Sequence, residues 1–119
     1  MSPQTIPILL NLVAAVAGAF GQFFYKKGSQ KIAQGFYLNS PLITGVLLFC
    51  VVMVLFVIAY RLGGKISVVY PFYATTFIWG TLIGVYLDNE PWRPLYAAGS
   101  VLLLMGLAVI AWASERGAL

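Results

Sequence analysis

Residues 41–60 read PLITGVLLFCVVMVLFVIAY, a run of mostly apolar side chains without a single charge. A helix of about 20 apolar residues, rising 1.5 Å per residue, crosses the roughly 30 Å hydrocarbon core of a bilayer. The run therefore predicts a membrane-spanning helix, and the rest of the chain repeats the pattern.

Charged residues divide the 119-residue chain into four runs of this kind. All ten charged side chains lie in five short clusters, and the stretches between the clusters carry none. Open strands would leave backbone groups unpaired in lipid, and four strands cannot close a barrel, so every run should be a helix. We predict an all-α membrane protein whose four transmembrane helices form an up-and-down bundle, a single domain over residues 1–119 with spans at about residues 5–25, 41–62, 66–87 and 93–113.

The composition argues against most soluble functions. Hydrophobic residues make up 61% of the chain and charged residues 8%, against about 25% charged residues in soluble domains. Because four spans leave only short connections, we expect no enzyme active site and no nucleic-acid binding. The net charge of +4 then concerns topology and lipid headgroups. With no histidine and only one cysteine, Cys50, the chain is expected to hold no cofactor and no metal.

The basic residues are almost equally divided between the two membrane faces. Four belong to the face with the first and third connections and three to the other: Lys26, Lys27, Lys31 and Arg93 against Arg61, Lys65 and Arg116. The positive-inside rule normally gives a clear excess on the cytoplasmic face. The chain therefore either inserts in both orientations or takes its orientation from a partner chain, with the first connection in the cytoplasm in at least one population.

The first span carries a face of small and polar residues. Helical spacing aligns six of them: Asn11, Ala14, Gly18, Gly21, Gln22 and Tyr25. Small residues let helices approach closely, so one interpretation is helix packing. The other is that Asn11 and Gln22 line a central cavity and coordinate a polar part of a substrate, since polar groups inside a membrane usually face an interior.

The third span combines aromatic residues with a proline. Pro71 has no backbone donor and predicts a bend around residues 69–73. A bend beside Tyr70 and Tyr73 indicates a substrate portal, and the alternative is a belt of interfacial aromatic residues. Further along the same span, the motif Gly80-x-x-x-Gly84 is typical of close helix packing.

The end of the third span and the fourth span hold the remaining candidates. Gly99 and Gly106, seven residues apart, predict a dimer interface on the last helix. Asp88 and Glu90 belong to a turn at the membrane surface, where water should keep them charged and separate from a central site. Glu90 and the basic residues of the same face can still exchange hydrogen bonds with a phosphate or with each other there.

Several short motifs resemble one family, the four-helix members of the drug/metabolite transporter superfamily. They follow the order of the family through nearly the whole chain: Gly21-Gln22-Phe23-Phe24-Tyr25-Lys26, Val69-Tyr70-Pro71, Phe77-Ile78-Trp79 and Asn89-Glu90-Pro91. They are most similar to the paired small subunits that flip aminoarabinose-linked undecaprenyl phosphate. The resemblance implies a multi-pass flippase subunit of the bacterial inner membrane, with Trp79 and Glu90 among the substrate-binding residues.

A second branch, the small multidrug resistance family, is more distantly similar to the chain. Its members work as antiparallel dimers and hold a glutamate in the first helix, at a position that falls on Gly18 here. Its third helix offers a tyrosine and a tryptophan to the substrate, and the same spacing falls on Tyr70 and Tyr73. Exchange of protons for cationic drugs needs a carboxylate inside the cavity, so its absence from all four spans favours the first branch.

The resemblance thus implies a transporter subunit for a polar or lipid-linked metabolite, with undecaprenyl-phosphate sugars as the first substrate class. The working unit would be a homodimer or a heterodimer with a sister chain. Lys26, Arg61 and Lys65 would meet the phosphate at the two surfaces while the isoprenoid tail stays in the bilayer. Two rivals stay open. One is a cation or drug transporter of the multidrug type, and the other is a membrane accessory subunit that transports nothing.

Overall fold

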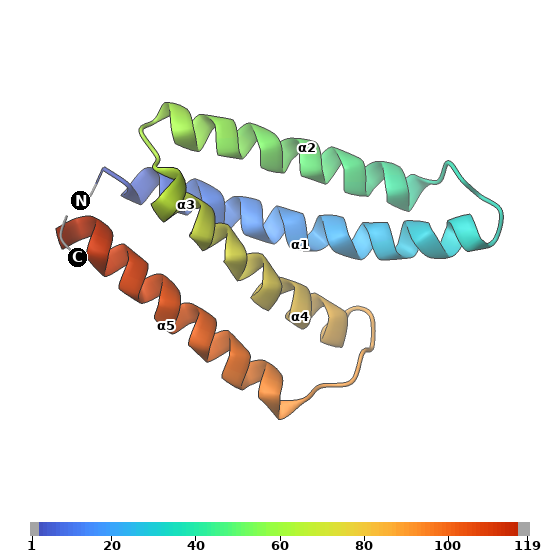
Figure 1. Ribbon diagram of the computed structural model, residues 1–119. Helices are drawn as coiled ribbons and strands as arrows, with labels where there is room; N and C mark the ends of the chain where they lie inside the picture. The colour runs from blue at the N-terminus through green and yellow to red at the C-terminus, as the bar shows by residue number, and fades with distance from the viewer. Residues whose placement is uncertain (1–2, 117–119) are drawn as a thin grey trace.

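The computed structural model describes residues 3–116, and this part of the chain is helical with short connections. The elements are α1 (Thr5–Ala33), α2 (Ser40–Arg61), α3 (Ile66–Phe72), the 3₁₀ turn η1 (Tyr73–Thr75), α4 (Thr76–Tyr86) and α5 (Pro94–Arg116), as Figure 1 shows. Because α3, η1 and α4 form one continuous span, four helical segments of the described chain are long and apolar enough to cross a membrane. The predicted fold class is confirmed, and the chain is a multi-pass membrane protein.

Consecutive spans run in opposite directions, as short connections require. The α1–α2 and α4–α5 connections lie at one end of the molecule, and both termini lie with the α2–α3 turn at the other end (Figure 1). Gly63 makes the α2–α3 turn with φ +96°, a left-handed conformation that glycine adopts without strain. The predicted tight turn at Gly63-Gly64 is confirmed. The basic clusters lie at the two ends of the molecule, in the two groups that the sequence predicts.

The first helix is longer than predicted. We expected the span to end near residue 25, but α1 continues to Ala33 through three lysines. Lysine is a good helix former, so a change from apolar to basic residues ends a span without ending its helix. The helix stops where Gly35, at φ +96°, closes the last turn, with the Phe36 N–H donating to the Lys31 carbonyl at 2.9 Å. At 29 residues α1 is about 43 Å long, so its lysine-bearing end extends beyond the hydrocarbon.

An asparagine joins the end of α1 to the start of α2. The Asn39 Oδ1 accepts the Leu42 N–H at 2.9 Å and caps α2, while its Nδ2 donates to the Gly28 carbonyl at 3.2 Å. Pro41 lies in the first turn of α2, where its missing donor does no harm, as predicted. The α1–α2 hairpin is thereby held together at its outer end.

Small residues let α1 and α2 pack closely along their length. A Cβ on Gly28 would lie 3.0 Å from the Leu42 Cα, so the two backbones touch at this level. Gly21 faces the Phe49 ring and Gly45 faces the Tyr25 ring, and the two rings stack with centroids 5.0 Å apart. An added Cβ on Gly28 would push the helices apart, whereas one on Gly21 or Gly45 would first displace the facing ring.

The third span is broken where the proline predicts a bend. Pro71 has no N–H for the helix, and the chain tightens into the 3₁₀ turn η1 directly after α3. The Thr75 hydroxyl donates to the Phe72 carbonyl at 3.1 Å within this turn. The break brings Tyr73 against α1.

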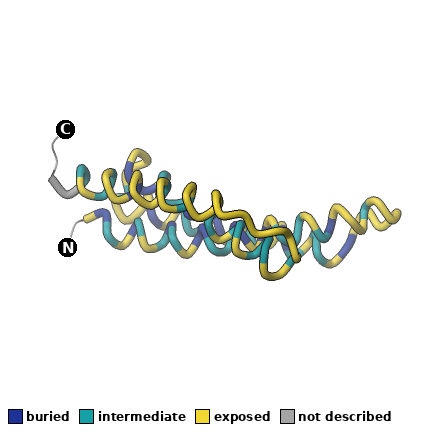
Figure 2. Tube along the Cα trace, turned by 90° about the horizontal axis from the view of Figure 1, so that it is seen from below, coloured by how far each residue is buried: buried dark blue, intermediate teal, exposed yellow. Residues whose placement is uncertain are grey.

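The last helix packs on the others far less than α1 does. In its membrane-spanning part 6% of the residues are buried, against 39% in α1. Leu107 is the buried residue of α5 among those described, and Figure 2 shows exposed residues along most of this helix. With Cα extents of 54 × 36 × 17 Å the chain is also flat. A flat chain with one loosely held helix leaves a large apolar surface for lipid or for a second chain.

Candidate functional site

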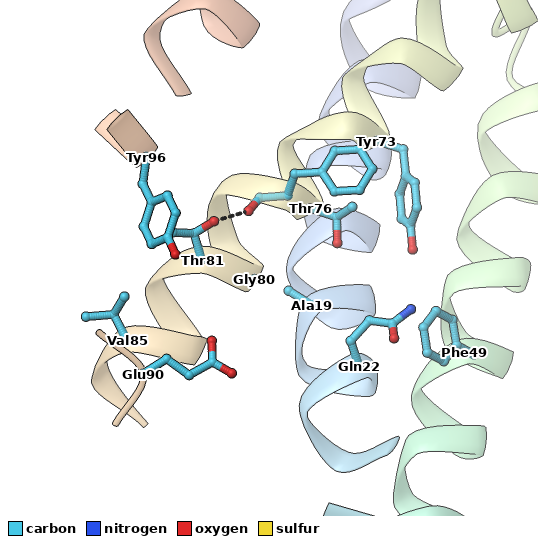
Figure 3. A pocket seen from close by; sticks show the side chains of 11 residues that line it. Ala19, Gln22, Phe49, Tyr73, Thr76, Gly80, Thr81, Val85, Glu90 and Tyr96 are labelled. Carbon is cyan, nitrogen blue, oxygen red and sulfur yellow. Dashed lines mark hydrogen bonds between the residues drawn. The ribbon is translucent and has the colours of Figure 1, made fainter. Parts of the chain in front are cut away.

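A cavity of about 700 Å³ opens between α1, α2, the third span and α5 (Figure 3). Its volume is within the range of about 300–1,000 Å³ that is usual for small-molecule sites. An amide, a carboxylate, two tyrosines and two threonines supply its polar groups. The lining residues are Ala19, Gln22, Phe49, Tyr73, Thr76, Phe77, Gly80, Thr81, Val85, Glu90 and Tyr96.

Polar groups stand on opposite sides of this cavity. Figure 3 shows Gln22 from α1 and Tyr73 from η1 on one side, with Glu90 and Tyr96 on the other. The Tyr73 ring lies over Gly18, where an added Cβ would collide with the Tyr73 hydroxyl. The Phe56 ring lies 5.0 Å from the Tyr73 ring, centroid to centroid. The glycine and the aromatic contact fix the direction of the tyrosine hydroxyl.

Gly80 keeps the middle of the cavity open. A Cβ built on Gly80 meets no atom within 4 Å, in contrast to the glycines that pack against neighbours. The Thr81 hydroxyl beside it donates to the Phe77 carbonyl of its own helix at 2.8 Å, as the dashed line in Figure 3 marks. A hydroxyl that donates to its own backbone still has lone pairs to accept from a ligand.

An ion cluster closes one end of the cavity. Lys26 contacts both Asp88 and Glu90, the latter at 2.7 Å, and the Lys27 Nζ lies 2.8 Å from the Asp88 Oδ1. The hydrogen bond from Lys26, followed by that from Lys27, lowers the pKa of Asp88 to about 2. Asp88 is 8% exposed and Glu90 is 48% exposed. A second pocket of about 150 Å³ lies at the cluster and shares Gln22 and Glu90 with the main cavity.

This cluster differs from the sequence expectation, in which water surrounds Asp88 and Glu90 and separates them from a central site. The long α1 carries Lys26 out to the α4–α5 connection, where it meets both carboxylates. Asn89, at φ +56°, turns the chain back so that the Glu90 N–H donates to the Gly84 carbonyl at 2.9 Å. Asp88 is therefore largely covered, and Glu90 forms part of the cavity wall.

Other predicted site residues lie outside the main cavity. Asn11 is buried on α1 and its Nδ2 donates to the Pro7 carbonyl at 3.3 Å; within residues 3–116 its Oδ1 has no hydrogen-bond partner. Tyr70 is exposed and packs its ring edge-on against Phe56. Trp79 lines a separate apolar pocket between α1 and α4.

The site residues predicted at the α2–α3 end of the molecule and on the last helix also lie outside the cavity. Arg61 and Lys65 flank the α2–α3 turn, at the end opposite the Lys26 cluster (Figure 1). Gly99 lines a shallow pocket between α4 and α5, and a Cβ on Gly106 meets nothing within 4 Å. The dimer interface predicted for these glycines stays a prediction.

The structure thus gathers Gln22, Tyr73 and Glu90 around one cavity, with Lys26 in the adjoining pocket. Sequence reasoning missed Thr76 and Tyr96. Thr76 lies three residues after Tyr73 and so shares its helical face, a signal that spacing alone could have given. Tyr96 reaches the cavity only through the placement of α5, which no local pattern reveals.

No protein-family model, no curated protein and no solved structure matches this chain. The fold and the cavity define a class, a four-span membrane protein with a cavity that is lined in part by polar side chains. Its similarity to flippase subunits is carried by the motifs quoted above and remains a prediction.

Proposed function

We propose that this chain is a subunit of a transporter that flips a lipid-linked polar metabolite across the bacterial inner membrane, with undecaprenyl-phosphate sugars as the substrate class. The polar side chains that line part of the cavity, with Lys26 in the adjoining pocket, support this proposal most strongly. A sugar head needs neutral hydrogen-bonding groups, and a phosphate needs a cation at headgroup depth. The isoprenoid tail never has to leave the bilayer.

Three polar residues of the cavity and three basic residues at the membrane surfaces have roles in this mechanism. The Gln22 amide and the hydroxyls of Tyr73 and Thr76 hydrogen-bond the sugar as it passes. Lys26 holds the phosphate at one surface, and Arg61 or Lys65 receives it at the other. The break at η1 lets Tyr73 move without unwinding a whole helix, because the regular series of α-helical hydrogen bonds is already interrupted there.

A second four-helix chain completes the transporter. The cavity lies beside α5, which one chain leaves largely uncovered, and the flat shape of the chain provides a broad face for a partner. The partner is either a second copy or a sister chain, and its spans close the open side of the cavity. Rocking of the two chains against each other then exposes the site to each surface in turn.

A cation transporter of the multidrug type is the second candidate, favoured by one observation. Glu90 lines the cavity, so a carboxylate is present at the site although none lies in a span. Against this candidate, the carboxylate forms an ion pair with Lys26 and is about half exposed, so it is not enclosed within the cavity.

Transport in vesicles tests the proposal. We expect wild-type protein to accelerate the movement of a fluorescent undecaprenyl-phosphate sugar between leaflets. Gly80→Leu, which fills the open middle of the cavity, should slow it at least about tenfold, equal to about 1.4 kcal/mol of barrier. Cys50→Leu introduces the same side chain at an exposed position of α2 and should leave the rate unchanged.

The alternatives give different results in the same vesicles. Proton-driven uptake of a lipophilic cation that is lost in Glu90→Gln would identify the multidrug-type transporter instead. Movement of neither substrate, with correctly folded protein and with a partner chain supplied, would contradict the proposal and favour an accessory subunit.

A further inference from the structure

Glu90 occupies a position where an anionic ligand would be expected. Its carboxylate lies 2.7 Å from the Lys26 Nζ and lines both the 700 Å³ cavity and the smaller pocket beside it. The smaller pocket also contains the Gln22 side chain and the Asp88 carboxylate. One carboxylate therefore lies between the cavity and the lysine at its end.

The backbone places this carboxylate specifically. Asn89 adopts φ +56°, and the Glu90 N–H donates to the Gly84 carbonyl at 2.9 Å, which folds the connection back onto α4. The carboxylate then rests on Gly84, where any added Cβ would collide with its Oε1. The absence of a side chain at Gly84 creates the notch that receives it.

The two acidic residues of the cluster are held differently. Asp88 contacts both lysines and is 8% exposed, so it is a fixed part of the fold. Glu90 contacts Lys26 among the described lysines and is 48% exposed. Exposed ion pairs contribute little to stability, so Glu90 can be exchanged for another anion while Asp88 stays in place. With Glu90 displaced, two lysines face one carboxylate, and one positive charge remains to be compensated.

We propose that Glu90, seated in the Gly84 notch, is an internal substitute for the phosphate of a lipid, and that Lys26 is the group that binds this phosphate. An incoming phosphate displaces the carboxylate from Lys26, because it brings a negative charge and acceptor oxygens of its own and the exposed Glu90–Lys26 pair is weak. Displacement also removes Glu90 from the cavity wall and joins the two pockets. This inference rests on the proposed function and specifies the substrate group that Lys26 recognises.

Binding of farnesyl phosphate to the full chain in detergent tests this competition. Glu90→Gln removes the competitor, and Gly84→Ala expels it while keeping every charge of the chain. We expect both variants to bind about twofold to fivefold more tightly than wild type, the gain that follows from loss of an exposed ion pair. The double variant should bind no more tightly than either single one, since both changes remove the same contact. Lys26→Gln should weaken binding at least about tenfold.

Control ligands separate the source of the phosphate. Farnesol, which lacks the phosphate, should show no gain in the variants, and inorganic phosphate should bind too weakly to distinguish them. An equal gain for inorganic phosphate would contradict the lipid assignment. Because Gly84→Ala alters packing, its helix content is checked by circular dichroism. If Gly84→Ala is unfolded, Glu90→Gln alone provides the test.

The inference and the proposed function can fail separately. Unchanged or weaker farnesyl phosphate binding in Glu90→Gln, while wild-type vesicles still flip the lipid-linked sugar, would overturn the inference alone. Absence of both binding and flipping in wild type would overturn both.

Discussion

Lys26 contacts two carboxylates that are distant from it in the sequence. The hydrogen bond to Glu90 spans 64 residues, and the bond from the neighbouring Lys27 to Asp88 spans 61. The three ion pairs that Lys26 and Lys27 form with Asp88 and Glu90 join the end of the first span to the connection between the third and fourth. The cluster therefore couples the α1–α2 hairpin to the α4–α5 hairpin.

Acid should loosen this connection. The pKa of Asp88 is lowered from 3.8 to about 2, so the folded state favours the carboxylate. The stability that Asp88 contributes is present above pH 4 and is lost as pH falls through about 2. We expect the wild-type Tm in detergent to fall between pH 4 and 2. Asp88→Asn should have a lower Tm at pH 7 and a smaller further loss in that range, and an identical pH profile in both proteins would contradict the role of Asp88.

Part of the site follows from sequence and part does not. Helical spacing placed Gln22 and Tyr73 together with small residues on inner faces, because the period of a helix is fixed. Hydrogen bonds between Glu90 and basic residues of the same face were one option from the sequence, but the choice of Lys26 and the pairing of Lys26 with Asp88 were not predicted. Pairing between distant residues depends on where a helix ends in space, and the lysines that mark the end of a span do not mark the end of α1.

At the scale of the elements, the spans were predicted more reliably than the packing between them. Hydropathy sets the length of each span because the bilayer has a fixed thickness. Proline and paired glycines also marked the break in the third span and the α2–α3 turn correctly. The low burial of α5 within the chain was not predictable. An apolar helix in lipid has the same composition whether it faces a neighbouring helix or the bilayer.

The α1–α2 contact gives a direct test of close packing. Gly28→Ala places a Cβ about 3.0 Å from the Leu42 backbone, which cannot move as a flexible side chain would. We expect a destabilisation of about 1–3 kcal/mol, the usual cost of overpacking, seen as a lower Tm in detergent. Gly80→Ala is the matched control, because its Cβ meets no atom within 4 Å and Gly80 lies outside the predicted dimer interface. Equal Tm values for the two variants would show that the helices are not in contact at Gly28.

At the scale of the whole molecule, the flat shape and the uncovered α5 explain why a partner is expected. If α5 forms the dimer interface, cysteine at Gly106 in a Cys50→Ser background should cross-link two chains in native membranes. The native Cys50, on the exposed face of α2, serves as the control and should cross-link poorly. Efficient cross-linking through Cys50 but not through the α5 position would place the interface on the other side of the chain.

The near-equal division of basic residues leads to a prediction about orientation. Reporters active in only one compartment, fused to the C-terminus, should show either mixed activity or a single orientation that depends on a partner chain. Mixed activity identifies an antiparallel homodimer. A single orientation in cells without any partner would contradict both explanations of the weak charge bias.

The central claim is that the cavity between the third span and α5 receives the polar head of a lipid-linked phosphate. A polyprenyl-phosphate sugar with a photoreactive group on the sugar tests this claim most directly, with labelled residues mapped by mass spectrometry in native-like membranes. We expect labelling of residues around Gln22, Tyr73 and Thr76 that is reduced by Lys26→Gln. Labelling confined to the outer faces of α2 and α5, or labelling unaffected by loss of Lys26, would contradict the claim.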